Sequence, residues 1–198
     1  MKIIIIGATG TIGTAVAEAL ETRGHEIVRA SRRGPVTVDM ADPASIDALL
    51  ASVRDVDAVV CCAASGRLTP LASDSDDDFT HGLDTKLLGQ LTLVRRALHR
   101  LRDGGSITLT SGVFEEPTPG GAFGALVNAG LEAFVQAAAI EMPRGLRVNS
   151  VSPGWVTETL RKMGSDGTGG TPAKDVARAY VEIVEGTAHG RTVTPRAL

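Results

Sequence analysis

The strongest constraint on the fold is a glycine-rich turn that directly follows a short apolar run near the start of the chain. Ile3–Ile6 are four consecutive isoleucines, a pattern typical of a strand that is buried on both faces. The spacing of Gly7, Gly10 and Gly13, followed by an amphipathic segment, predicts a strand, a tight turn and a helix. The first N–H groups of that helix would then face the edge of the sheet.

Short apolar runs alternate with longer amphipathic segments along the rest of the chain. The expected strands are Ile3–Ile6, Glu26–Ala30, Val36–Val38, Asp57–Cys62, Ser106–Thr110, Leu146–Val151 and Arg191–Thr194. The expected helices are Thr11–Arg23, one that opens at Asp42-Pro43, and residues 79–101, 119–141 and 172–186. This alternation predicts a Rossmann-type, doubly wound α/β fold, with a seven-stranded, mostly parallel sheet in three α/β/α layers. We expect residues 1–198 to form a single domain.

A glycine turn between a strand and a helix is typical of a dinucleotide-binding site. Gly7 permits the tight turn, Gly10 permits close approach of the backbone to a pyrophosphate, and Gly13 permits close packing of the helix. The N-terminus of the helix offers N–H donors and positive potential to the phosphates. The cofactor contacts expected from this turn are Gly7, Thr9, Gly10, Thr11, Ile12 and Gly13.

The end of the second expected strand indicates which dinucleotide is bound. An NAD-selective site usually carries an acidic residue here, which accepts from the ribose 2′-OH. This chain has Ser31, Arg32 and Arg33 instead, and a hydroxyl with a guanidinium suits a 2′-phosphate. We therefore expect NADP(H) as the cofactor, with Ser31 and Arg32 at the 2′-phosphate. The alternative is that both arginines are simply solvated.

Composition limits the classes of partner. The net charge is −3 and aromatic residues make up 3% of the chain, which argues against binding nucleic acid or an anionic membrane. The apolar run at the N-terminus is too short for a signal peptide or a membrane span. Cys61 and Cys62 are adjacent, so we expect free thiols in a reducing cytoplasm. No Cys/His spacing predicts a metal site. We expect a cytoplasmic protein that binds a small-molecule substrate.

Several motifs, taken in order, resemble those of the short-chain dehydrogenase/reductase family over almost the whole chain. They are the Gly7/Gly10/Gly13 turn, Val38–Met40, Cys61–Ala64 where the family usually has Asn-Asn-Ala-Gly, Gly105–Ile107 leading into Thr110–Gly112, and Arg147–Val156. The last run is the most specific, because it resembles the family's Pro-Gly motif nearly residue for residue.

The resemblance implies further cofactor contacts. They are Asp39 and Met40 at the adenine, Ala63 and Ala64 beneath the adenosine, Pro153 and Gly154 of the Pro-Gly motif, and the Val156 backbone at the nicotinamide carboxamide. Asp39 has an alternative role as the cap of a turn. Residues 157–171 would form a lid on the substrate side, with Glu158 where a cofactor-contacting Thr is common.

The catalytic positions of the family, which are Ser, Tyr, Lys and Asn, match this chain poorly. Ser111 matches the serine, but the tyrosine position is Gly124 and the lysine position is Asn128. The sole tyrosine, Tyr180, belongs to a late helix. Lys86 stands where the family has its asparagine, so the Lys and Asn side chains are exchanged between two neighbouring helices. The catalytic candidates are therefore Ser111, Lys86 and Asn128, and chance divergence of an inactive site is the alternative.

The expected function is that of an NADP(H)-dependent reductase of a small carbonyl or enone, in which Ser111 and Lys86 stabilise developing oxyanion charge. Burial would lower the pKa of Lys86 toward that of a useful acid. The competing hypothesis is a weak or inactive NADP(H) sensor, whose glycine-rich segment Gly164–Gly170 orders when ligand binds.

Self-association is a further expectation. Family members commonly pair through the two long helices expected here at 79–101 and 119–141, giving a homodimer or homotetramer. An apolar stripe on the first of these helices fits either that interface or packing against the core. The stripe consists of Leu87, Leu91, Val94 and Leu98.

Overall fold

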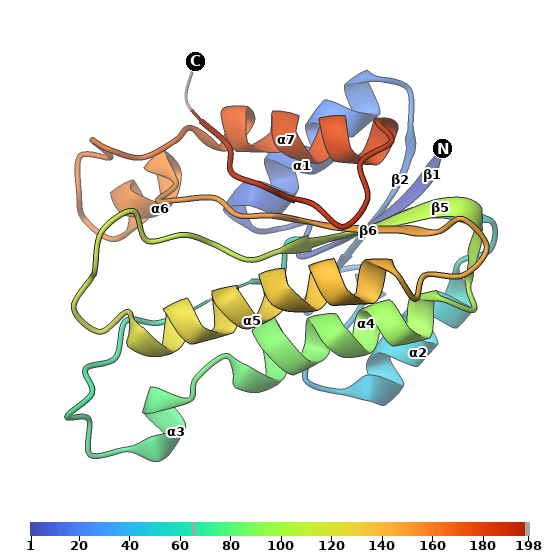
Figure 1. The fold of residues 1–198 in the computed structure, drawn as a ribbon. Coiled ribbons are helices and arrows are strands. Elements are labelled where there is room, and N and C mark those ends of the chain that lie inside the picture. The colour runs from blue at the N-terminus through green and yellow to red at the C-terminus, as the bar shows by residue number, and fades with distance from the viewer. Residues whose placement is uncertain (65, 197–198) are drawn as a thin grey trace.

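The computed structural model describes residues 1–64 and 66–196, which form a sheet between two layers of helices (Figure 1). The strands are β1 (Lys2–Ile6), β2 (Glu26–Ser31), β3 (Val36–Thr37), β4 (Val56–Cys61), β5 (Leu101–Thr110), β6 (Arg147–Val151) and β7 (Thr192–Val193). The helices are α1 (Thr11–Thr22), α2 (Pro43–Ser52), α3 (Asp76–Phe79), the π-helix η1 (Leu83–Leu88), α4 (Gly89–Ala97), α5 (Ala122–Ala139), α6 (Thr157–Lys162) and α7 (Ala173–Glu185).

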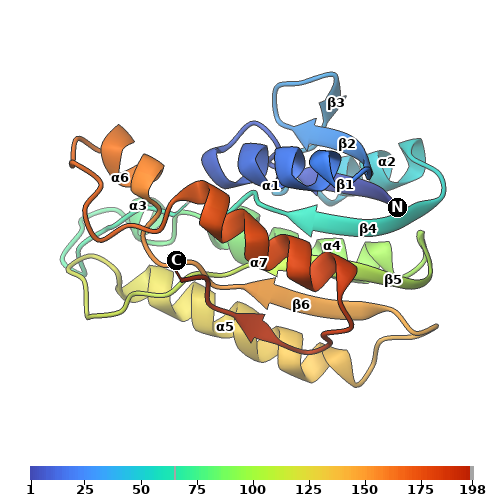
Figure 2. The same ribbon diagram turned by 90° about the horizontal axis from the view of Figure 1, so that it is seen from above.

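The sheet has the strand order β3-β2-β1-β4-β5-β6-β7, and each of its pairings is parallel. The predicted Rossmann-type fold with seven strands is therefore confirmed. The carboxyl ends of the strands meet at one edge of the sheet (Figure 2). From β1 the chain first builds outward to β3 and then returns to β4, so the order reverses between β1 and β4 at this edge. Ligands of open α/β sheets bind at such a reversal.

The four isoleucines of β1 show how the sheet is buried. Ile3 and Ile5 pack on the side covered by α1 and α7, whereas Ile4 and Ile6 pack on the side covered by α2, α4 and α5 (Figure 1). All four side chains are at most 1% exposed. A strand that buries both faces needs apolar residues at consecutive positions, and this is the physical basis of the sequence pattern.

The prediction of a single helix over residues 79–101 is wrong. Gly82 has a φ of +94°, which ends the helical conformation after α3, and the chain then continues as η1 and α4. Helix α4 ends at Ala97, and β5 already begins at Leu101 rather than Ser106. At the start of α4, a Cβ on Gly89 would lie 2.3 Å from the Met40 carbonyl oxygen. This close contact fixes η1 against the loop that follows β3.

The apolar stripe that was expected on the 79–101 helix lies on η1 and α4 and packs against the core. Val94 is buried, and three leucines are partly buried against the same core cluster: Leu87, Leu91 and Leu98. The core-packing alternative therefore accounts for the spacing of these residues.

Helix α5 is the one helix among the described residues that is long and apolar enough to cross a membrane by length and composition. Its inward side chains Val127, Leu131 and Val135 are buried in the core beside β6 and η1. A helix that packs on the sheet of a soluble protein meets the same criterion.

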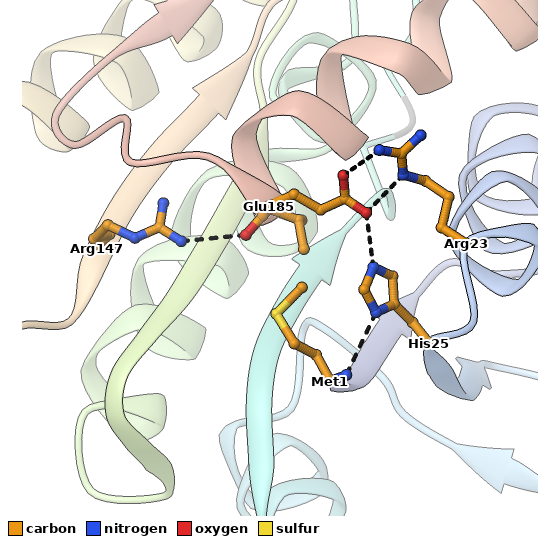
Figure 3. A network of polar contacts seen from close by, with 6 residues as sticks. Met1, Arg23, His25, Arg147 and Glu185 are labelled. Atoms are coloured by element: carbon orange, nitrogen blue, oxygen red, sulfur yellow. Dashed lines mark hydrogen bonds and ion pairs between the residues drawn. The ribbon is translucent and has the colours of Figure 1, made fainter.

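A polar network ties the opposite, amino-terminal edge of the sheet together (Figure 3). The Glu185 carboxylate at the end of α7 accepts from both Arg23 nitrogens at 2.6 Å and lies 2.9 Å from His25 Nε2. These two partners lower the pKa of Glu185 to about 2. His25 Nδ1 lies 3.4 Å from the Met1 amino group, and Arg147 donates to the last carbonyls of α7. The network holds α1 and α7 together on the edge opposite the site described below.

The contact of Gly89 predicts a large difference between two Gly→Ala substitutions in helices. Gly89→Ala should destabilise the protein by about 1–3 kcal/mol, because the new methyl group meets a backbone oxygen that cannot move freely. Gly130→Ala in α5 should raise stability by up to about 1 kcal/mol, since its nearest neighbour is the flexible Leu87 Cδ1 at 3.7 Å. Urea denaturation measures both, and equal effects would contradict the prediction.

Candidate cofactor cleft and active site

Two adjoining hollows open at the carboxyl edge of the sheet and meet at Gly10, Cys62 and Ala64. The small cavity, of about 420 Å³, is lined by Ile6, Gly7, Thr9, Gly10, Ser31, Arg32, Arg33, Val38, Asp39, Met40, Cys62, Ala63, Ala64 and Thr85. The large cleft, of about 760 Å³, contains the other candidate residues except Gly13, which lines neither hollow, together with aromatic and lid side chains. These are Thr11, Ile12, Lys86, Ser111, Phe114, Gly124, Asn128, Pro153, Gly154, Trp155, Val156, Thr159 and Met163.

The glycine turn between the two hollows is packed against its neighbours. Gly7 has a φ of +81°, and a Cβ on it would lie 2.7 Å from the Ala63 backbone nitrogen. A Cβ on Gly13 would lie 2.1 Å from the Gly7 carbonyl oxygen. Gly10 differs, because its Cβ would meet only that carbonyl oxygen, at 3.3 Å. Packing therefore requires glycine at positions 7 and 13, whereas Gly10 keeps an open face toward both hollows.

The small cavity brings together the residues that sequence analysis placed around an adenosine. Ser31 is 6% exposed at the end of β2, and the exposed Arg32 follows it. Among the described residues, no carboxylate forms an ion pair with Arg32 or Arg33. Asp39 Oδ1 accepts from the Ala41 N–H at 3.0 Å. The alternative role of Asp39 as a turn cap is thus observed, although its side chain also lines the cavity.

The large cleft brings Ser111, Lys86 and Asn128 to one place from three segments: the end of β5, η1 and α5. Burial lowers the pKa of the Lys86 ammonium to about 8. The Asn128 side chain is 7% exposed, and its Oδ1 has no hydrogen-bond partner among the described residues. An unpaired buried carbonyl oxygen is costly, so it marks a position where a ligand donor would be stabilised.

Ser111 donates a hydrogen bond to a carboxylate that was not predicted from the sequence. Glu132, one helical turn beyond Asn128 on α5, accepts from Ser111 Oγ at 2.9 Å and from Ser152 Oγ at 2.8 Å. A hydroxyl has one proton to donate, so the proton of Ser111 is directed away from the cleft. The signal in the sequence is the four-residue spacing from Asn128 to Glu132, which places both on one face of a helix.

Two aromatic side chains in the large cleft were also missed. The rings of Phe114 and Trp155 pack edge to face with centroids 6.1 Å apart. A Cβ on Gly124 would lie 3.3 Å from Phe114 Cε2, so the Phe114 ring occupies the space beside Gly124, the position at which the tyrosine is expected. The low aromatic content of the chain gives no hint of this placement.

Tyr180 lies in the core rather than in either hollow. It is fully buried on α7, and its hydroxyl lies 2.6 Å from Thr110 Oγ1. Burial raises its pKa well above the usual value for tyrosine. The residue is thus not available as an acid in the cleft.

The lid side of the cleft begins at Val156. The Val156 carbonyl accepts from the Thr159 and Leu160 N–H groups of α6. Glu158, expected where a cofactor-contacting Thr is common, lines neither hollow, and its Oε2 accepts from the Ala173 N–H at 2.9 Å. It therefore caps α7.

Known proteins resemble the chain along most of its length. The family model described as Enoyl-(Acyl carrier protein) reductase matches residues 7–189. The 3-oxoacyl-[acyl-carrier-protein] reductase FabG of Salmonella typhimurium is 31% identical over 195 residues, which cover 86% of this chain and 80% of that protein. The structure of protein lin1944 from Listeria innocua is 40% identical, with a TM-score of 0.91 and 98% of both chains covered. A small-chain dehydrogenase in complex with NADPH shares the fold, at 23% identity and a TM-score of 0.86, with 98% of this chain and 95% of that chain covered.

The sheet order and the glycine turn define a Rossmann-type α/β protein with its site at the strand-order reversal. The matches then give the family: the chain belongs to the short-chain dehydrogenase/reductases, a family of oxidoreductases that use nicotinamide cofactors.

The burial of Lys86 predicts a pH-dependent cost in stability. Lys86→Met should stabilise the cofactor-free protein by about 1–3 kcal/mol at neutral pH, because the wild type holds an ammonium out of water. The ordinary pKa is 10.5 and the folded pKa is about 8, so the unfolded chain binds more protons between these values. Wild-type stability therefore rises over this range, and its deficit relative to the variant shrinks.

Urea denaturation at about pH 7 and about pH 10 measures this cost. Lys174→Met, at an exposed position of α7, is the matched control and should show no such trend. A difference between wild type and Lys86→Met that stays constant with pH would contradict the prediction.

Proposed function

We propose that the chain is an NADP(H)-dependent oxidoreductase of a small carbonyl, enone or alcohol substrate, with Lys86 as its proton donor. The observation that carries the proposal is the meeting of Lys86, Ser111 and Asn128 in the large cleft, next to the cavity that holds Ser31 and Arg32. Neither hollow alone has room and polar groups for both a dinucleotide and a substrate.

The residues of the small cavity fit the adenosine half of NADP(H). The Arg32 guanidinium and the Ser31 hydroxyl suit a 2′-phosphate, and no carboxylate of the described residues competes for Arg32. The open face of Gly10 and the N–H groups at the start of α1 suit the pyrophosphate. At the other end, the Val156 carbonyl is engaged by α6, so its N–H is the group offered to a carboxamide. When bound, the nicotinamide supplies or accepts a hydride.

The chain's own residues would handle the proton. Because Ser111 donates to Glu132, it offers lone pairs to the cleft rather than a proton. The Lys86 ammonium is then the group that donates to a substrate oxygen and stabilises its developing charge. Its pKa of about 8 is suited to proton transfer near neutral pH. The Asn128 amide, with its unpaired Oδ1, would orient a donor group of the substrate or the cofactor.

A second candidate function is an NADP(H) sensor with little or no turnover. It is favoured by the packing of the Phe114 ring beside Gly124, which closes the usual position of the acid. Turnover separates the two candidates, because both require NADP(H) binding.

Lys86→Ala should lower the turnover number for NADPH-dependent carbonyl reduction by about 10²–10⁴-fold, the usual contribution of a general acid. The dissociation constant for NADPH should stay within about two-fold, since Lys86 lies in the substrate half of the site. The wild-type turnover number should fall as the pH rises through about 8, because the acid form of Lys86 is lost. NADPH oxidation across a panel of small ketones, aldehydes and enones measures this, with calorimetry for binding.

Three outcomes decide between the candidates. Turnover that survives in Lys86→Ala would contradict the role of Lys86. Tight NADPH binding by the wild type without any turnover would favour the sensor. A wild type that binds neither NADPH nor NADH would overturn both.

We also propose that the chain forms a homodimer or homotetramer through α5. The outer side of this helix carries an exposed stripe of small and apolar side chains that runs its whole length. It consists of Ala122, Ala125, Leu126, Ala129, Gly130, Ala133, Ala137 and the adjoining Ile140. Leu126 is 63% and Ile140 is 90% exposed. A contiguous apolar surface of this kind is stabilised when a second copy of the helix covers it.

Ala133→Arg should convert the oligomer to a monomer, because a guanidinium in the middle of the stripe would have to be desolvated without a partner. Light scattering on a sizing column measures the mass. Ala51→Arg, at an exposed position of α2, is the control and should leave the oligomer intact. A wild type that is monomeric at high concentration would contradict the proposal.

A further inference from the structure

The lid helix α6 lies beside the glycine turn and is anchored at its base. The Thr157 N–H donates to the Thr171 carbonyl at 3.1 Å, and Thr157 Oγ1 donates to the Gly170 carbonyl at 2.8 Å. Thr159 and Met163 line the large cleft. The free end of α6, at Lys162, therefore lies where the lid meets the start of α1.

Among the described residues, Lys162 makes the one side-chain hydrogen bond between α6 and the segment that holds the glycine turn. Its Nζ donates to Thr11 Oγ1 at 2.8 Å, across 151 positions of the sequence. Thr11 is the first residue of α1, and the first turn of α1 carries no acidic side chain. Among the described residues, no carboxylate forms an ion pair with Lys162. An ammonium thus lies against the positive end of a helix with no negative charge to balance either.

The other charged side chains of α6 are engaged elsewhere. Glu158 caps α7 through the Ala173 N–H, and Arg161 Nε donates to the Asp166 carbonyl within the lid loop. The Glu158 carboxylate, which would repel a phosphate, is therefore held at α7 and not at the glycine turn. Lys162, one helical turn after Glu158, is the charged residue of α6 that reaches it.

We propose that Lys162 is a cofactor-binding residue that contacts the pyrophosphate of NADP(H) from α6, which rests on the proposed function. The two charges of the pyrophosphate balance the ammonium and the helix end together.

Calorimetric titration of the full chain with NADPH and with adenosine 2′-monophosphate tests this. Lys162→Ala should weaken NADPH binding about ten-fold, as expected for the loss of one charge-assisted hydrogen bond, and the salt dependence of binding should become weaker. Affinity for adenosine 2′-monophosphate, which has no pyrophosphate, should not change. Arg32→Ala should weaken both ligands, and the matched control Arg161→Ala should weaken neither.

Each other result would overturn the inference. Unchanged NADPH affinity in Lys162→Ala, with tight binding by the wild type, would exclude the contact and leave the proposed function standing. An equal loss in Arg161→Ala would indicate a general effect of lid charge. A loss of adenosine 2′-monophosphate binding in Lys162→Ala would place the contact elsewhere. Absence of NADPH binding by the wild type would overturn the proposed function as well. Thermal melting without ligand checks that the variants are folded.

Discussion

The Gly7 turn packs against the backbone that follows β4 on one side and against the first turn of α1 on the other, and no side chain fits in either contact. Because of this packing, β1 and β4 lie side by side with their carboxyl ends at the same level. The start of α1 is held above the strand-order reversal. Both hollows meet there, at Gly10 and Cys62. Lys162 of α6 contacts the same place, through Thr11 at the start of α1.

The polarity of the large cleft follows from what each side chain already contacts. Ser111 donates its hydrogen bond to Glu132, Asn128 Oδ1 has no hydrogen-bond partner among the described residues, and burial lowers the pKa of the Lys86 ammonium. The cleft therefore holds one charged donor, Lys86, beside the acceptor oxygens of Ser111 and Asn128 and the amide NH2 of Asn128. In a site that relied on tyrosine, the tyrosine hydroxyl would be the proton donor. Here the Phe114 ring fills the space beside Gly124. The sequence alone does not reveal which groups donate and which accept in the cleft, because this depends on hydrogen bonds such as that from Ser111 to Glu132.

Sequence patterns predicted the strands and the glycine turn well, since consecutive isoleucines and fixed glycine spacing reflect local requirements. They failed at residues 79–101, where Gly82 adopts a left-handed conformation and Gly89 meets the Met40 backbone. Both effects depend on tertiary contacts that periodicity does not contain. Glu132 and Lys162 were missed for the same reason, because their partners lie 21 and 151 positions away in the chain. Resemblance to the motifs of a family predicted Ser111, Lys86 and Asn128 as candidates, and all three line one cleft.

The π-helix η1 has a consequence for how Lys86 came to face the cleft. A π-helical turn holds an additional residue within a helical run, and such turns are frequent at functional sites. In an α-helix each residue advances the direction of its side chain by about 100°. Removing one residue from Leu83–Leu88 should therefore turn the Lys86 side chain by about 100° relative to α4. The direction of the Lys86 ammonium thus depends on the number of residues in η1 as well as on the chemistry of the side chain.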